Sequence, residues 1–262
     1  MFFRMSTLTL GLVLCAIVGG AVALGTAVGR RLRDRPGMRH EPVGVVQGAL
    51  LGLVGLLLAF GLTMSVGRYD ARRALVVHEA DTIGTTFLRA QLLAEPARSD
   101  SLDLLTGYAD AAISLADDVS DSPEFAVATA FMSDLQRDLW RNAGIAVAGD
   151  PEGSAPRLYV ETLNEMIDAH SDRLASLRNR VPLTVLGLQV FGSAVALGVL
   201  ALYLALLGRG LLTALVATVV VLLILFISFD LDRPNRGFIT VPDRPLVEAR
   251  AGMEAAPAAA GP

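Results

Sequence analysis

Apolar residues gather in four runs along the chain, and no charged side chain interrupts any of them. The runs cover about Thr7–Val28, Val43–Val66, Leu183–Leu207 and Gly210–Phe229. Each run reaches the roughly 20 residues that a helix needs to cross the hydrocarbon core of a bilayer. Buried helices of a soluble protein are a poor alternative for four uncharged runs of this length. The pattern therefore predicts four transmembrane helices.

The first run has a second interpretation, because a secretory signal peptide also combines a basic start with an apolar stretch. Arg4 precedes the run, and small residues follow it. However, the run is long and stops at the basic stretch GRRLRDR, which is typical of a true span. We therefore expect it to remain in the protein as a span.

Polar residues divide the chain into four parts. These are residues 1–67 with two spans, 68–181 as a helical extramembrane domain, 182–230 with two further spans, and 231–262 as a C-terminal segment. Residues 246–262 are mostly Ala, Pro and Gly, and are predicted to be a disordered tail because they can bury too little apolar surface. No strand pattern competes with the helical one, so the predicted fold class is all-α.

The extramembrane domain reads as helices separated by proline-containing turns. One helix is predicted to begin at Pro123, with Ser122 as its N-cap and Glu124 in its first turn. Its core-facing positions are predicted to be Phe125, Ala128, Phe131, Met132, Leu135 and Leu139. A last helix is predicted over about Arg157–Asn179.

The second span has no proline at its end, so it is predicted to continue into the extramembrane domain as one helix from Gly44 to Leu93. Such a helix would be about 75 Å long at 1.5 Å per residue. Beyond the span it carries a stripe with alternating spacings of four and three residues, made of Val76, Ala80, Ile83, Phe87 and Ala90. This spacing indicates one buried face.

Glycines four residues apart mark the first two spans. Gly25 and Gly29 form one such pair, and Gly44, Gly48 and Gly52 form two consecutive pairs. Small residues at this spacing let helices approach closely in lipid. Two interpretations remain open, because the partner helix can belong to the same chain or to another subunit around a shared axis.

Charge and motifs narrow the function classes. Residues 68–180 hold 11 Arg against 19 Asp and Glu, an excess of eight negative charges. Nucleic acid binding needs a basic face, so no nucleic acid partner is expected.

The only cysteine is Cys15, so no intrachain disulfide can form. No nucleophile elbow, phosphate-binding glycine loop, HExxH or CxxC occurs, so we expect neither enzyme activity nor a cofactor.

Potential metal ligands are scattered over the predicted helices. One set contains His78, Glu79 and Asp81, and a second contains Asp168, His170 and Asp172. Scattered His and Asp on solvated helices are usually surface residues, so we expect no metal site in either set.

Three stretches carry a resemblance to a known family. The stretch LLLAFGLTMSVGRYDARRAL resembles the second-span signature of bestrophins, in which a Phe is followed eight residues later by an Arg–aromatic pair. HEADTIGTTFLRAQLL and FDLDRPNRGF look still more like the bestrophin-like domain family, a bacterial membrane family. The resemblance covers about Val43–Phe238, and its signature residues are Arg68, Tyr69, Asp70, Arg72, Glu79 and Arg89.

The resemblance implies a pentameric ion channel whose second span lines a central pore. Channels of the family narrow at three bulky apolar side chains spaced four residues apart, and these positions correspond to Gly52, Leu56 and Phe60. Such a ring gates by dewetting. This chain departs from the pattern at Gly52, which is not bulky, and at Tyr69, the single aromatic where the channels have two. An acidic vestibule also repels anions, so the ion sign stays open.

The end of the fourth span resembles the acidic calcium clasp of animal bestrophins. Asp230 and Asp232 supply carboxylates there, which suit calcium. Two acids alone are too few for such a site, so we expect no bound metal.

Arginine counts leave the orientation open, because the first loop is denser in arginine while the opposite side holds more arginines in total. The resemblance places the extramembrane domain and both termini in the cytoplasm.

All basic residues are arginine, and with the abundant Ala, Leu and Val this suggests a GC-rich bacterial genome. We expect a multi-pass protein of the bacterial cytoplasmic (inner) membrane.

Two functional hypotheses follow. The first is an oligomeric bestrophin-like ion channel or pore whose partners are the lipid membrane, further copies of the chain (five by the resemblance) and inorganic ions. The second is a non-conducting, membrane-anchored helical scaffold or sensor. The spacing from Phe60 to Arg68 favours the first, whereas Gly52 and the acidic domain favour the second.

Overall fold

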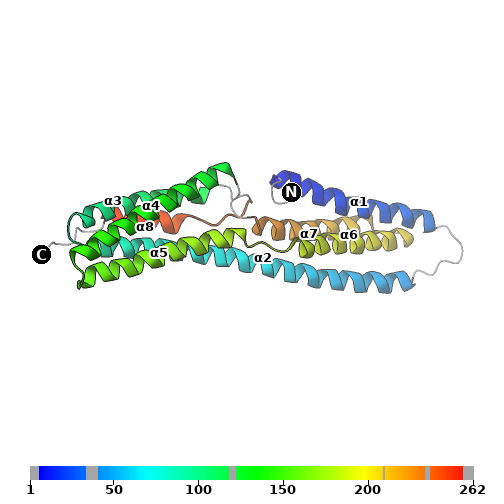
Figure 1. Ribbon diagram of the computed structural model, residues 1–262. Coiled ribbons are helices and arrows are strands. Elements are labelled where there is room, and N and C mark those ends of the chain that lie inside the picture. Colours follow the sequence, from blue (N-terminus) through cyan, green and yellow to red (C-terminus); the bar gives the residue numbers. More distant parts are fainter. Residues whose placement is uncertain (1–5, 34–40, 118–121, 209, 234–236, 256–262) are drawn as a thin grey trace. The chain divides into compact units, whose positions relative to one another are not determined.

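The computed structural model describes residues 6–33, 41–117, 122–208, 210–233 and 237–255. Within these ranges the chain forms eight α-helices and no strand, which confirms the all-α prediction (Figure 1). Among the described residues, four helices are long and apolar enough to cross a membrane. The chain forms two compact units. Unit 1 contains Met1–Tyr69 and Arg180–Ile239, and unit 2 contains Asp70–Asn179 and Thr240–Pro262.

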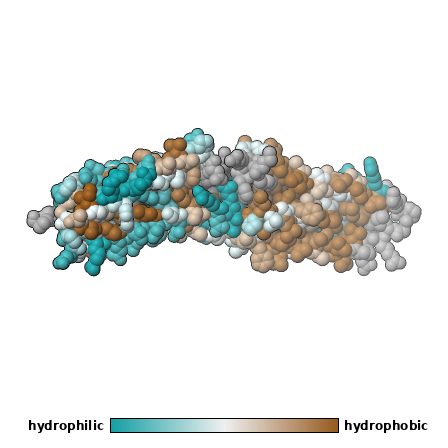
Figure 2. Space-filling model, viewed as in Figure 1, coloured by the Kyte–Doolittle hydropathy of each residue, from teal (hydrophilic) through white to brown (hydrophobic). Residues whose placement is uncertain are grey.

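Unit 1 holds the four predicted apolar runs. They lie in α1 (Thr7–Arg33), the first part of α2 (Glu41–Ala90), α6 (Leu183–Leu206) and α7 (Leu211–Leu231). Apolar side chains from all four helices form one buried cluster that includes Leu14, Leu58, Leu197 and Phe229. The face of the unit that Figure 2 shows is also mostly hydrophobic, as expected where lipid replaces water.

Glycines bring α1 and α6 into close contact. A Cβ atom on Gly25 would collide with the carbonyl oxygen of Gly198, and one on Gly29 would lie 2.5 Å from the carbonyl oxygen of Leu202. No other residue fits these two positions of α1 without a shift of the backbone. The pair Gly25–Gly29 therefore packs within the chain.

One polar contact joins α2 to α6. The buried Gln189 donates a hydrogen bond of 3.0 Å from Nε2 to the carbonyl oxygen of Leu57. Gly61 leaves room for this side chain, since a Cβ there would overlap the Gln189 amide. A bilayer holds no water to satisfy an unpaired amide, so this hydrogen bond fixes α2 against α6 within unit 1.

Unit 2 contains the rest of α2 with α3 (Ala97–Asp117), α4 (Pro123–Gly149), α5 (Ser154–Arg178) and α8 (Arg244–Ala255). The predicted stripe of α2 is confirmed, because all five of its residues are buried in the core of this unit; they are Val76, Ala80, Ile83, Phe87 and Ala90. The face of unit 2 that Figure 2 shows is largely hydrophilic. Burial of apolar surface from water therefore drives the packing here.

Two predictions for α4 have different outcomes. Ser122 caps the helix as expected, since its Oγ accepts a hydrogen bond of 3.0 Å from the N–H of Phe125. Phe131 was predicted to face the core, which is wrong, because it is 54% exposed. Met132 and Leu139 define the buried side of α4, and Phe131 lies about 100° away from Met132 around the helix.

The prediction of a disordered tail from Leu246 onward is wrong as far as Ala255, because these residues belong to α8. Leu246 and Met253 lie seven residues apart on one side of α8 and are buried in the core of unit 2. Arg250 also donates a hydrogen bond of 2.7 Å from Nε to Asp110 on α3. The segment has too few apolar residues for a core of its own, but it adds two to a core built by other helices. Residues 256–262 lie outside the described residues.

Replacing Gly25 by alanine is expected to destabilise the protein, because the new methyl group would meet the backbone of Gly198. The cost should be about 1–3 kcal/mol, as for other overpacked sites. Thermal unfolding in detergent measures this as a lower midpoint. Gly20→Ala is the matched control, because a Cβ there has no atom within 4 Å. Equal midpoints for the two variants would contradict the close α1–α6 contact.

Candidate functional site

The three predicted pore positions lie on a side of α2 that the described part of the chain leaves open. Leu56 is 53% exposed and Phe60 is 61% exposed. A Cβ on Gly52 would have no neighbouring atom within 4 Å. Val54 and Leu58, by contrast, are buried in the core of unit 1. All three positions are therefore accessible to lipid, water or another protein chain.

The apolar part of α2 is covered less than the other candidate spans. Only 11% of its apolar stretch is buried, against 22% for α1 and 28% for α7. The helices α1, α6 and α7 pack on one another within unit 1. α2 is therefore the helix of this unit with the largest surface left for other contacts.

The glycines of α2 differ in their surroundings from those of α1. A Cβ on Gly44 would lie 3.0 Å from the ring of Tyr203, so this glycine packs against α6. At Gly48, Gly52 and Gly55 a Cβ would meet nothing within 4 Å. Most of the glycine face of α2 therefore has no partner within the described chain.

Small and bulky residues occupy neighbouring sectors of this open side. At 100° per residue, Gly48, Gly55 and Ala59 share one sector, and Leu56 and Phe60 lie in the next. Gly52 falls between the two sectors. A small sector permits close approach of another helix, while the adjacent bulky sector projects side chains away from that contact.

The signature residues near the end of the apolar run do not gather in one place. Arg68 and Tyr69 are half-buried in unit 1, and Asp70 is exposed. Arg72 is buried and belongs to unit 2. Farther along α2, Arg89 donates a hydrogen bond of 2.8 Å from Nη1 to the carbonyl oxygen of Leu158 on α5.

The signature residue Glu79 lies at the centre of a buried charge cluster in unit 2. Its side chain is fully buried, with Oε1 2.7 Å from His170 Nδ1 and Oε2 2.5 Å from Arg173 Nη1. Arg173 also reaches the carbonyl oxygen of Ala112 on α3, at 3.4 Å. The ring of Tyr108 packs edge-on against His170 with 6.0 Å between ring centroids. The cluster thus joins α2, α3 and α5.

Electrostatics favour an ionised Glu79 in this cluster, which lies beyond the apolar part of α2. Burial raises the pKa of Glu79, but the hydrogen bond from His170 and the positive charge of Arg173 together lower it below its usual value. Burial, and then the negative charge of Glu79, raise the pKa of Tyr108 far above its usual value. Tyr108 therefore remains a neutral hydroxyl, and it accepts a hydrogen bond of 3.2 Å from Gln136.

Sequence reasoning missed this cluster. The interpretation of His170 as a surface residue is wrong, since both His170 and its partner Glu79 are buried. The prediction treated His170 with Asp168 and Asp172, but those two side chains are exposed. A signal was present, because Met166, His170 and Arg173 continue the spacing of four and three residues on the buried side of α5.

Asp230, in the last turn of α7, and Asp232, directly after it, bind backbone groups of their own unit. Asp232 is fully buried and accepts from the N–H of Val181 at 3.0 Å. Asp230 is also buried and accepts from the N–H of Ile239 at 2.9 Å. Gly237 leaves room for the Asp230 carboxylate, because a Cβ on Gly237 would lie 2.6 Å from it. Both carboxylates therefore hold chain connections next to α6 and α7.

Within the described residues, no three side chains of His, Cys, Asp or Glu come together in a way that could hold a metal ion. Glu79 and His170 pair two potential ligands, but the third group at this carboxylate is Arg173. A positive guanidinium beside the carboxylate repels a cation, so this cluster is suited to internal charge balance.

The family model described as "Bestrophin-like domain" matches residues 12–246 of the chain. No curated protein and no solved structure matches it.

Glu79→Gln is expected to destabilise unit 2, because Arg173 would keep a buried charge without its carboxylate partner. The loss at neutral pH should be on the order of 3 kcal/mol. Unfolding in detergent, followed by circular dichroism, measures this loss. Glu161→Gln is the control, since Glu161 is exposed and lies 3.6 Å from Arg89.

The difference in stability between the wild type and Glu79→Gln should also depend on pH. The folded pKa of Glu79 is lower than the value of 4.5 expected when unfolded, so its stabilisation is fully present above pH 4.5. It is lost as the pH falls through the lower folded value. The stability gap between wild type and Glu79→Gln should therefore narrow below pH 4.5. A gap that widens with acid would contradict an ionised Glu79.

Proposed function

The chain belongs to the bestrophin-like domain family, and on this premise we propose that it forms an oligomeric membrane pore in which α2 of each copy faces a shared axis. Membership of the family and the four apolar helices make it a membrane protein. Each copy crosses the membrane four times in this proposal, through α1, α2, α6 and α7. The membrane is the cytoplasmic membrane of a bacterium, with unit 2 on its cytoplasmic side.

The open side of α2 is the observation that carries the proposal. Lipid chains are as apolar as leucine, so a helix facing only lipid gains nothing from a row of glycines. Yet no described residue packs against Gly48, Gly52 and Gly55 of α2. By contrast, Gly25 and Gly29 of α1 pack against the backbone of α6. A neighbouring copy that packs on the small sector of α2 would bring Leu56 and Phe60 of every copy toward a common axis.

Leu56 and Phe60 would form two apolar rings in such a pore. Narrow apolar rings stop ion flow by expelling water, so these rings would act as a neck. Gly52 would contribute no side chain, and the pore would be wider at that level. The bulkiest ring in this arrangement is the one formed by Phe60, and it should limit conductance most.

The first experiment is the mass of the detergent-purified complex. The proposal needs several copies, and the family resemblance sets the expected number at five. A pentamer is the expected result. A monomer under conditions that keep the protein folded would contradict the pore and favour a membrane-anchored helical scaffold.

Phe60→Ala is expected to raise single-channel conductance in planar bilayers severalfold, because the narrowest apolar ring loses its aromatic side chains. Phe191→Ala is the matched control, since Phe191 on α6 is 68% exposed but does not lie on α2. Its conductance should equal that of the wild type. An unchanged conductance for Phe60→Ala in a pore that conducts would exclude Phe60 from the neck.

A further inference from the structure

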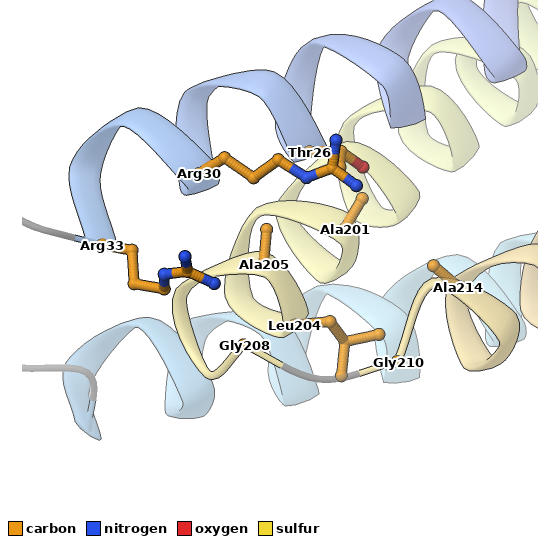
Figure 3. Close-up of a pocket in the computed structure, with 9 residues that line it drawn as sticks. All are labelled: Thr26, Arg30, Arg33, Ala201, Leu204, Ala205, Gly208, Gly210 and Ala214. Carbon is orange, nitrogen blue, oxygen red and sulfur yellow. The ribbon is translucent and has the colours of Figure 1, made fainter.

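A small cavity lies in unit 1 where α1 ends, α6 ends and α7 begins (Figure 3). Its volume is about 290 Å³. At roughly 30 Å³ per water molecule, this space equals that of about ten waters and can hold a small anionic group. The cavity is separate from the open side of α2 and from the charge cluster around Glu79.

Two arginines of the last turn of α1 line this cavity. Arg30 and Arg33 are three residues apart, which places them on one side of the helix. Figure 3 shows both side chains extending toward the space between α1 and the end of α6. Nη1 of Arg33 lies 3.6 Å from the position that a Cβ on Gly208 would take. Arg31, between them in sequence, does not line the cavity.

The opposite wall combines small residues with the start of a helix. Gly208 and Gly210 adopt positive φ angles of 67° and 78°, which glycine tolerates best. The residue at the start of α7 is Gly210, which has no side chain to cap the helix. The first N–H groups of a helix lack partners within it and carry partial positive charge. These amides add to the positive potential that the two arginines create.

The cavity also lies at the level where the apolar runs of three helices end or begin. The uncharged run of α1 ends two residues before Arg30, the run of α6 ends beside Gly208, and the run of α7 begins at Gly210. The floor is apolar and includes Ala201, Leu204 and Ala205 of α6. Three apolar runs that end together mark the level of the lipid headgroups.

We propose that this cavity binds the phosphate group of an anionic phospholipid. The guanidinium groups of Arg30 and Arg33 form charge-assisted hydrogen bonds to the phosphate oxygens, a geometry that arginine matches with two parallel donors. The acyl chains lie outside the cavity along the apolar surface of unit 1. Basic pockets at helix ends of membrane proteins suit anionic headgroups over zwitterionic ones, because net charge adds to the phosphate contacts.

Native mass spectrometry of the purified complex tests the proposal by counting bound lipids. Phosphatidylglycerol is titrated into delipidated protein, with phosphatidylcholine and inorganic phosphate in parallel arms. Wild type is expected to retain one phosphatidylglycerol per chain more tightly than phosphatidylcholine. The double variant Arg30→Gln, Arg33→Gln should bind this lipid about tenfold to a hundredfold more weakly, as expected for the loss of charged hydrogen bonds.

The variant Arg31→Gln is the matched control, because it removes a charge from the same turn without touching the cavity. It should bind phosphatidylglycerol as wild type does. Equal weakening by both variants would show a general charge effect and overturn the site. If inorganic phosphate displaced the lipid at equal concentration, the site would bind free phosphate, and the proposal of a phospholipid ligand would be overturned. The thermal midpoint without lipid should match among all variants, and this comparison excludes misfolding as a cause.

Discussion

Helices inside a bilayer cannot gain stability by hiding apolar side chains from lipid, so close packing must hold unit 1 together. Its glycines show how this constraint is met. Gly25 and Gly29 let the backbone of α1 reach that of α6, and Gly61 leaves space for the buried amide of Gln189. The same residue type on the open side of α2 meets nothing in the described chain. Both the fold of unit 1 and the case for an oligomer therefore rest on where small residues find a partner.

Unit 2 follows different rules, because its visible surface is largely hydrophilic (Figure 2). Apolar stripes on α2, α3, α4 and α5 form its core, and α8 completes that core with Leu246 and Met253. Glu79, His170 and Arg173 stand inside this apolar setting and balance one another's charge. Such a cluster adds less net stability than its contacts suggest, but removal of one member leaves an unpaired buried charge. It therefore specifies which faces of α2 and α5 come together.

The two proposals concern different parts of unit 1 and different physical effects. The pore depends on apolar side chains and small residues on one side of α2. The phosphate site depends on charge at the ends of α1 and α7, where the apolar runs stop. Either can hold without the other, because binding of a lipid at the helix ends requires no conduction. If both hold, bound lipid would occupy the space between α1 and the α6–α7 turn of every copy.

The sequence by itself determined the number and the type of the main elements. Uncharged apolar runs have a length that only a membrane requires, and the stripe from Val76 to Ala90 has a spacing that only a helix face explains. Ser122 predicted the start of a helix correctly, because an N-cap is a local interaction. The family also followed from a short local signature around Phe60 and Arg68.

Only tertiary structure decided which partner each face of a helix meets. Glu79 and His170 are 91 residues apart and came together because their helices pack, and α8 became ordered because other helices supplied its core. The cavity at Arg30 likewise needs three helix ends to meet. Local patterns fix which face of a helix is apolar, but contacts between distant segments fix what that face touches.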